Sequence, residues 1–101
     1  MDRASETPTP DATLARRFGI AVRRLREVRG LSQERLAARA VLNRSYMGEI
    51  ERAAVMPSLA TAAKLAHALE LPLWQLMQRC EGERGPDVAA EARRVPPAAG
   101  A

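Results

Sequence analysis

The sequence predicts an all-α domain of five short helices with unstructured segments at both ends. Three observations lead to this fold class. The apolar residues are dominated by Ala and Leu, which favour helix, and β-branched residues are few. Apolar residues recur at helical spacing in five segments between residues 12 and 79. Residues that cap or stop helices separate these segments, and a chain of 101 residues suffices for one domain.

The first predicted helix spans residues 12–29. One apolar stripe with helical periodicity runs along it, formed by Leu14, Phe18, Ala21, Val22, Leu25 and Val28. Arginines occupy most of the remaining surface. Gly30 is expected to end the helix in the left-handed conformation, which lets Leu31 pack back over the helix end.

Two shorter helices follow, separated by a minimal turn. Ser32 is the predicted N-cap of helix 33–40, and Asn43 is the predicted N-cap of helix 44–52. The inward residues of this pair are expected to be Leu36, Ala37, Ala40, Leu42, Met47 and Ile50. Helical geometry then directs another set outward, namely Arg44, Ser45, Gly48, Glu49 and Arg52.

The fourth and fifth helices complete the predicted domain. Ser58 caps a helix over residues 59–70, whose inward face is Leu59, Ala62, Leu65, Ala66 and Leu69. Pro72 suits the first turn of a last helix that reaches about Arg79. Leu73, Leu76 and Met77 form the apolar side of that helix.

The chain ends differ from the helical segment in composition and in charge. Residues 1–11 are rich in Pro, Thr and Ser and are predicted to be a disordered arm, and residues 80–101 a mobile tail. The folded segment, 12–79, holds twelve basic side chains against five acidic ones, while the whole chain has a net charge of only +4. A folded domain more basic than its tails favours a polyanionic partner, although an arginine-rich composition alone is the alternative.

Several functions are disfavoured by what the sequence contains. Cys80 is the only cysteine, so an intramolecular disulfide is excluded, and no Cys/His set suits a zinc ion. No signal peptide or membrane-spanning run is visible, which predicts a cytoplasmic protein that does not enter a membrane. His67 is a single histidine without an evident catalytic partner, so we expect neither an enzyme nor a cofactor.

The order of motifs between residues 18 and 77 resembles the phage-repressor/Cro-like (XRE family) helix-turn-helix regulators. The matching motifs are Gly30-Leu-Ser-Gln33, Leu36-Ala37, Asn43-Arg-Ser-Tyr46, Glu49-Ile-Glu-Arg52, Pro57-Ser-Leu59 and Lys64-Leu-Ala66. This resemblance implies a five-helix, lambda-repressor-like DNA-binding domain. It also implies that helix 44–52 is the recognition helix, which docks in the major groove of double-stranded DNA.

The resemblance assigns DNA contacts by position. Base contacts are implied for Arg44, Ser45 and Glu49, with Arg44 suited to guanine; for Glu49, an ion pair with Arg44 or Arg52 is an equal alternative. Phosphate contacts are implied at positions along the same edge, namely Gln33, Asn43, Tyr46, Arg52 and Ser58. Asn43 and Ser58 are expected to act first as helix caps.

The sequence departs from the family at two turn positions where glycine is usual. Val41 follows the second helix and Ala53 follows the recognition helix. Both positions tend to need a positive φ, which is unfavourable for a residue with a side chain and most of all for a β-branched one. Either Val41 is strained or this turn takes another shape, and we expect Val41→Gly to raise the melting temperature.

A domain this small makes few base contacts, which favours a homodimer on a two-fold symmetric operator. The interface is predicted on the last helix and its flanks, at Val55, Leu73, Trp74 and Met77. For Trp74, the alternative is a lid on the core of its own chain. The Asn43–Tyr46 run is similar to that of restriction–modification controller proteins, which slightly favours a controller over the other candidate of this class, a phage-type repressor. A different function is that of an antitoxin or other module that binds a partner protein through the tail or the last helix.

Overall fold

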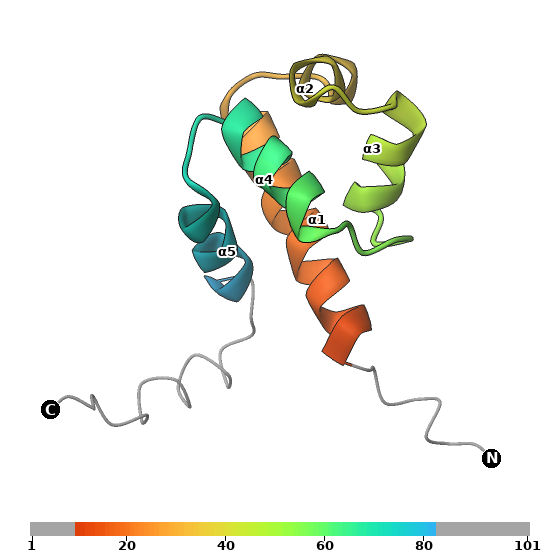
Figure 1. Ribbon diagram of the computed structural model, residues 1–101, viewed down its shortest axis with the longest axis vertical. Coiled ribbons are helices and arrows are strands. Elements are labelled where there is room, and N and C mark those ends of the chain that lie inside the picture. The colour runs from red at the N-terminus through yellow and green to blue at the C-terminus, as the bar shows by residue number, and fades with distance from the viewer. Residues whose placement is uncertain (1–9, 83–101) are drawn as a thin grey trace, which may run out of the picture.

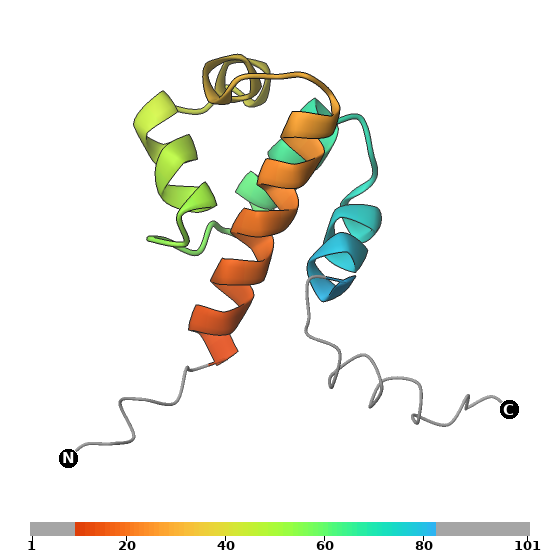
Figure 2. The ribbon, with the colours of Figure 1, turned by 180° about the vertical axis from the view of Figure 1, so that it is seen from behind.

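The part of the protein that the structure describes is a bundle of five helices, which the computed structural model in Figure 1 shows in ribbon form. The structure describes residues 10–82. The helices are α1 (Pro10–Val28), α2 (Gln33–Ala40), α3 (Arg44–Glu51), α4 (Leu59–Ala68) and α5 (Leu73–Gly82). Helix α1 packs against α3 and α5, α2 packs against α3 and α4, and α4 packs against α5. The view from behind in Figure 2 places α3 and α5 on opposite sides of α1. The all-α, five-helix prediction is confirmed.

One hydrophobic core joins all five helices. Its fully buried large side chains are Phe18, Val22, Leu36, Met47, Ile50, Leu65, Leu69, Leu76 and Cys80. Phe18 is the only aromatic residue among them, so aliphatic side chains and alanines fill the rest of the core. Alanine lets helix axes approach closely, because it places only a methyl group between them.

Two residues predicted to face the core do not. Val28 is 83% exposed and Leu59 is 69% exposed. The buried face of α1 is centred on the side of Ala15 and Phe18, and at 100° per residue Val28 lies roughly 80° from Phe18, at the edge of that face. Leu59 is the first residue of α4 and extends past the core, so these two predictions were wrong.

The helix ends differ from the predicted ones by a few residues. Helix α1 begins at Pro10, inside the predicted arm, and α5 continues to Gly82, inside the predicted tail. Cys80, predicted to begin the tail, is buried in α5 against the core. The rest of the predicted arm and tail lies outside the described residues. Within residues 10–82, no helix combines the length and apolarity needed to cross a membrane.

Four of the helices end in the same backbone motif. After α1, α2, α3 and α4, a residue with positive φ and the residue that follows it donate their N–H groups back to carbonyls of the last turn, the pattern of a Schellman cap. The residue with positive φ is Gly30 after α1, but Val41 (φ 57°), Ala53 (φ 63°) and Glu70 (φ 64°) after the other three. Of the two alternatives left open by the sequence, the structure has the left-handed conformation at Val41, and Ala53 has it as well. Glu70 is a third such position, which was not predicted from the sequence.

Candidate nucleic-acid interface

The predicted recognition helix lies at one side of the bundle, next to α2 (Figure 1). Met47 and Ile50 are fully buried and fix one face of α3 on the core. The opposite face carries the three predicted base-contact residues, Arg44, Ser45 and Glu49. The first two are exposed and the third is half-buried. We call these three residues the recognition surface.

The side chains of the recognition surface are not tied to one another. Within residues 10–82, Glu49 forms no ion pair with Arg44 or Arg52, in contrast to the alternative considered from the sequence. Their polar groups are therefore free to contact a ligand. Further arginines of the helix-turn-helix are exposed, namely Arg35 and Arg39 on α2 and Arg52 directly after α3.

Asn43 and Ser58 are helix caps, as predicted. The Asn43 side-chain oxygen accepts from the backbone N–H groups of Ser45 (2.7 Å) and Tyr46 (3.3 Å). The Ser58 hydroxyl accepts from the Thr61 N–H (3.1 Å) and donates to the Thr61 hydroxyl (3.2 Å). Capping therefore occupies the oxygen of Asn43 and leaves its amide N–H groups available for a phosphate. The half-buried Tyr46 packs against the core.

A largely buried ion pair connects α1 to the C-terminal end of α3. Arg26 donates through Nε to Glu51 Oε2 (2.7 Å) and through Nη2 to Glu51 Oε1 (3.1 Å). A third bond, from Nη1 to the Leu31 carbonyl (2.9 Å), links the pair to the turn before α2. The side chains of Arg26 and Glu51 are 12% and 3% exposed. The hydrogen bonds to Glu51 raise the pKa of Arg26, so this guanidinium keeps its positive charge.

Gln33 belongs to the same network. Its Nε2 donates to Glu51 Oε1 (3.0 Å), which holds the amide at the N-terminal end of α2 against the C-terminal end of α3. The side chain that was predicted to contact a phosphate is therefore held in place by hydrogen bonding within the protein. The network of Arg26, Glu51 and Gln33 was not predicted from the sequence, because Arg26 and Glu51 are 25 residues apart.

Gly48, predicted to face outward, is buried. The guanidinium of Arg52 lies over it, with Nη1 3.0 Å from the position that a Cβ would take. The Gln33 side-chain oxygen is 3.8 Å from the same position. Gly48 is buried for a simple reason. Glycine brings no side chain of its own to the surface, and the long side chains of its neighbours cover it.

The four residues predicted at a dimer interface divide into two groups. Val55, Leu73 and Met77 are half-buried and pack against the core of their own chain. Trp74 is 63% exposed, so it does not form a lid on that core. Trp74 thus remains the member of this set with the most apolar surface available to a partner.

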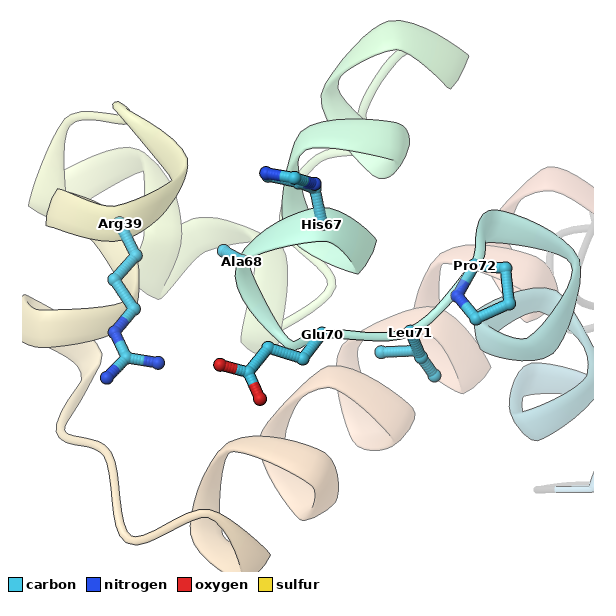
Figure 3. A pocket seen from close by; sticks show the side chains of 6 residues that line it. All are labelled: Arg39, His67, Ala68, Glu70, Leu71 and Pro72. Carbon is cyan, nitrogen blue, oxygen red and sulfur yellow. The ribbon is translucent and has the colours of Figure 1, made fainter.

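An open depression lies between the C-terminal end of α2 and the turn from α4 to α5 (Figure 3). In Figure 3 the Glu70 carboxylate is directed toward Arg39, while the ring of His67 is directed away from Glu70. Glu70 accepts from Arg29 Nη1 at 3.2 Å on the surface. The described residues contain no group of three or more potential metal ligands.

Comparison with known proteins places these features in context. The model of the helix-turn-helix domain family matches residues 17–76. Among solved structures, the restriction-modification controller protein C.AhdI from Aeromonas hydrophila is 44% identical, with a TM-score of 0.60, over 61% of this chain and 94% of its own. The clp gene regulator ClgR from C. glutamicum is 25% identical, with a TM-score of 0.67, over 72% of this chain and 95% of its own. A search of curated proteins returned no significant match.

Proposed function

Because the chain belongs to the helix-turn-helix domain family, we propose that it is a transcriptional regulator that binds double-stranded DNA and catalyses no reaction. The observation that carries this proposal is the geometry of α3. Two fully buried side chains, Met47 and Ile50, fix the helix on the core, and the recognition surface on its other face is free of internal ion pairs. A helix held in this way can enter the major groove as a rigid body.

Base recognition is assigned to the recognition surface. Arg44, in the first turn of α3, is exposed and suits a bidentate contact to guanine O6 and N7, which discriminates by about 1–3 kcal/mol. Ser45, next to it, can donate to or accept from a base edge. Glu49 lies one turn further along the helix and can only accept, which suits the amino group of cytosine.

Phosphate contacts are assigned to the edge around the recognition surface. Gln33 and Arg52 form the part nearest the C-terminal end of α3, and Asn43 and Tyr46 the part at its N-terminal end. Ser58 lies at the N-terminus of α4, where free backbone N–H groups favour an anion. These contacts would orient the domain on DNA without reading its sequence.

We propose further that the protein acts as a homodimer on a pseudo-palindromic operator, with half-sites about one helical turn apart (about 10–10.5 bp). The exposed Trp74 supports an interface that includes α5, together with Leu73, Met77 and Val55. The similarity to the controller protein C.AhdI supports a restriction–modification controller, and a phage-type repressor is the second candidate of the same class.

Selection of bound sites from random duplex DNA, followed by gel-shift titration at several salt concentrations, tests this function. We expect a two-fold symmetric consensus and binding that weakens steeply with salt. With the Arg44→Ala variant, we expect one position in each half-site to lose its base preference. If the wild-type protein retarded no duplex even at low salt, the proposal would be wrong, and a protein partner would become the leading hypothesis.

A further inference from the structure

We propose that Gly48 is a positioning residue for DNA binding. Because it lacks a side chain, the guanidinium of Arg52 can lie back over α3 next to the amide of Gln33. The two side chains, one from α2 and one following α3, then form a single phosphate-binding pair. This inference rests on the proposed DNA-binding function and extends it to a residue that contacts no DNA itself.

The geometry around Gly48 is the first support for this proposal. Arg52 Nη1 lies 3.0 Å from the position of a Cβ at residue 48, closer than most real Cβ contacts, and Arg52 Cζ lies at 3.9 Å. The Gln33 side-chain oxygen lies 3.8 Å from the same point. A methyl group at residue 48 would therefore push the guanidinium aside by a few tenths of an ångström, because Arg52 is the exposed and flexible partner.

The second support is that Gln33 cannot follow such a displacement. Its Nε2 donates to Glu51 Oε1 at 3.0 Å, and Glu51 is held by two hydrogen bonds from Arg26. The Gln33 oxygen lies 3.8 Å from the Cβ position of residue 48, and the second hydrogen of Nε2 is the donor that Gln33 has for a phosphate oxygen, because the amide oxygen only accepts. Moving Arg52 would thus separate the pair instead of moving it as a unit.

The third support is that the Arg52 guanidinium has no competing acceptor. No hydrogen bond or ion pair joins it to another side chain in the part of the chain that the structure describes. Its donors are therefore available to phosphate oxygens, with which a guanidinium forms strong charge-assisted bonds.

Helix propensity makes this role testable. Alanine is the best helix former and glycine one of the poorest, so a purely structural view predicts that Gly48→Ala improves the protein in every respect. The positioning role predicts that Gly48→Ala changes stability and DNA affinity in opposite directions. The variant should unfold at an equal or higher temperature and yet bind DNA more weakly.

The test is a double-mutant cycle with Gly48→Ala and Arg52→Gln on a duplex enriched in the selection experiment. We expect Gly48→Ala to weaken binding by about fivefold to tenfold, the scale of a weakened charged hydrogen bond. Arg52→Gln should weaken binding at least as much and reduce the salt dependence of log K by about one per subunit. In the Arg52→Gln background, Gly48→Ala should have no further effect.

Gly82→Ala is the matched control. It adds the same methyl group to a helical glycine with no atom within 4 Å, so its DNA binding should equal that of the wild type. Wild-type affinity of Gly48→Ala, or the same loss with and without Arg52, would overturn the positioning role while leaving the DNA-binding function intact. Failure of the wild-type protein to bind any duplex would overturn both.

Discussion

At the scale of single residues, left-handed backbone positions distinguish this chain. Gly30, Val41, Ala53 and Glu70 end four successive helices with positive φ, and only the first is a glycine. A residue with a Cβ pays roughly 1–2 kcal/mol for this conformation. The Schellman hydrogen bonds and the packing of the helices on each other hold these residues in place. Glycine at one of the three other positions would avoid this cost, so it should raise the free energy of unfolding.

Val41→Gly is expected to stabilise the domain by about 1 kcal/mol, which corresponds to about 4–8 °C in melting temperature for a domain of this size. Val41 has φ 57° and ψ 50°, and it is 80% exposed, so its side chain contributes little packing. Thermal unfolding followed by circular dichroism measures the effect. Val41→Ala keeps a Cβ in the left-handed region and should gain much less. An equal gain in both variants would show that β-branching, not positive φ, is the source of strain.

At the scale of elements, an ion pair holds the C-terminal end of α3 against α1. Arg26 on α1 and Glu51 on α3 form a bidentate pair that is almost inaccessible to solvent, and Gln33 on α2 joins it. Removing one partner of such a pair is costly, since it leaves the other charge buried, whereas replacing both by apolar residues is often nearly neutral.

Arg26→Met is therefore expected to destabilise the domain by about 3–5 kcal/mol, enough to unfold much of a small domain. The double variant Arg26→Met with Glu51→Met should recover most of this loss. Urea unfolding of both variants at equal pH and salt gives the comparison. If the single variant lost less than 1 kcal/mol, the pair would behave like a surface salt bridge.

The contact between α1 and α3 also depends on a glycine. A Cβ at Gly19 would lie 2.6 Å and 2.7 Å from the carbonyl oxygens of Ile50 and Glu51. These are backbone atoms, so the helices themselves would have to move apart. Gly19 thus sets the distance at which α3 is held.

Gly19→Ala is expected to cost about 1–3 kcal/mol or more, in spite of the higher helix propensity of alanine. Chemical unfolding measures the change, and Gly82→Ala, which meets no neighbouring atom, is the control. A stabilised Gly19→Ala variant would contradict the close approach of the two helices.

At the scale of the whole molecule, Trp74 is the main candidate for an interface anchor. It is 63% exposed on α5, and a large aromatic side chain commonly dominates the energy of an interface. We expect the wild-type protein to elute as a dimer whose melting temperature rises with concentration. Trp74→Ala should shift elution toward the monomer and remove that concentration dependence.

Leu59→Ala is the control for this experiment, because Leu59 is similarly exposed (69%) but lies on α4. Dissociation by Leu59→Ala and not by Trp74→Ala would place the interface elsewhere. A wild-type protein that is monomeric at all concentrations would contradict the proposed homodimer.

The sequence by itself determined the features that depend on neighbours within about one helical turn. Ser32, Asn43 and Ser58 cap the helices that they were predicted to cap. The periodicity of apolar residues located all five helices, and the spacing of motifs identified α2 and α3 as a helix-turn-helix. These signals are local, because capping and helical hydrogen bonds join residues three or four positions apart.

Only the tertiary structure decided which distant residues meet. Arg26 was one arginine among six on the first predicted helix, and its pairing with Glu51 required the crossing of α1 and α3. The same crossing explains why Gly19 must lack a side chain. Gly48 was expected at the surface, yet Arg52 covers it. Periodicity predicts the face of the helix on which a residue lies. The residue that it contacts depends on the angle and distance at which two helices pack, and neither can be deduced from a short-range sequence pattern.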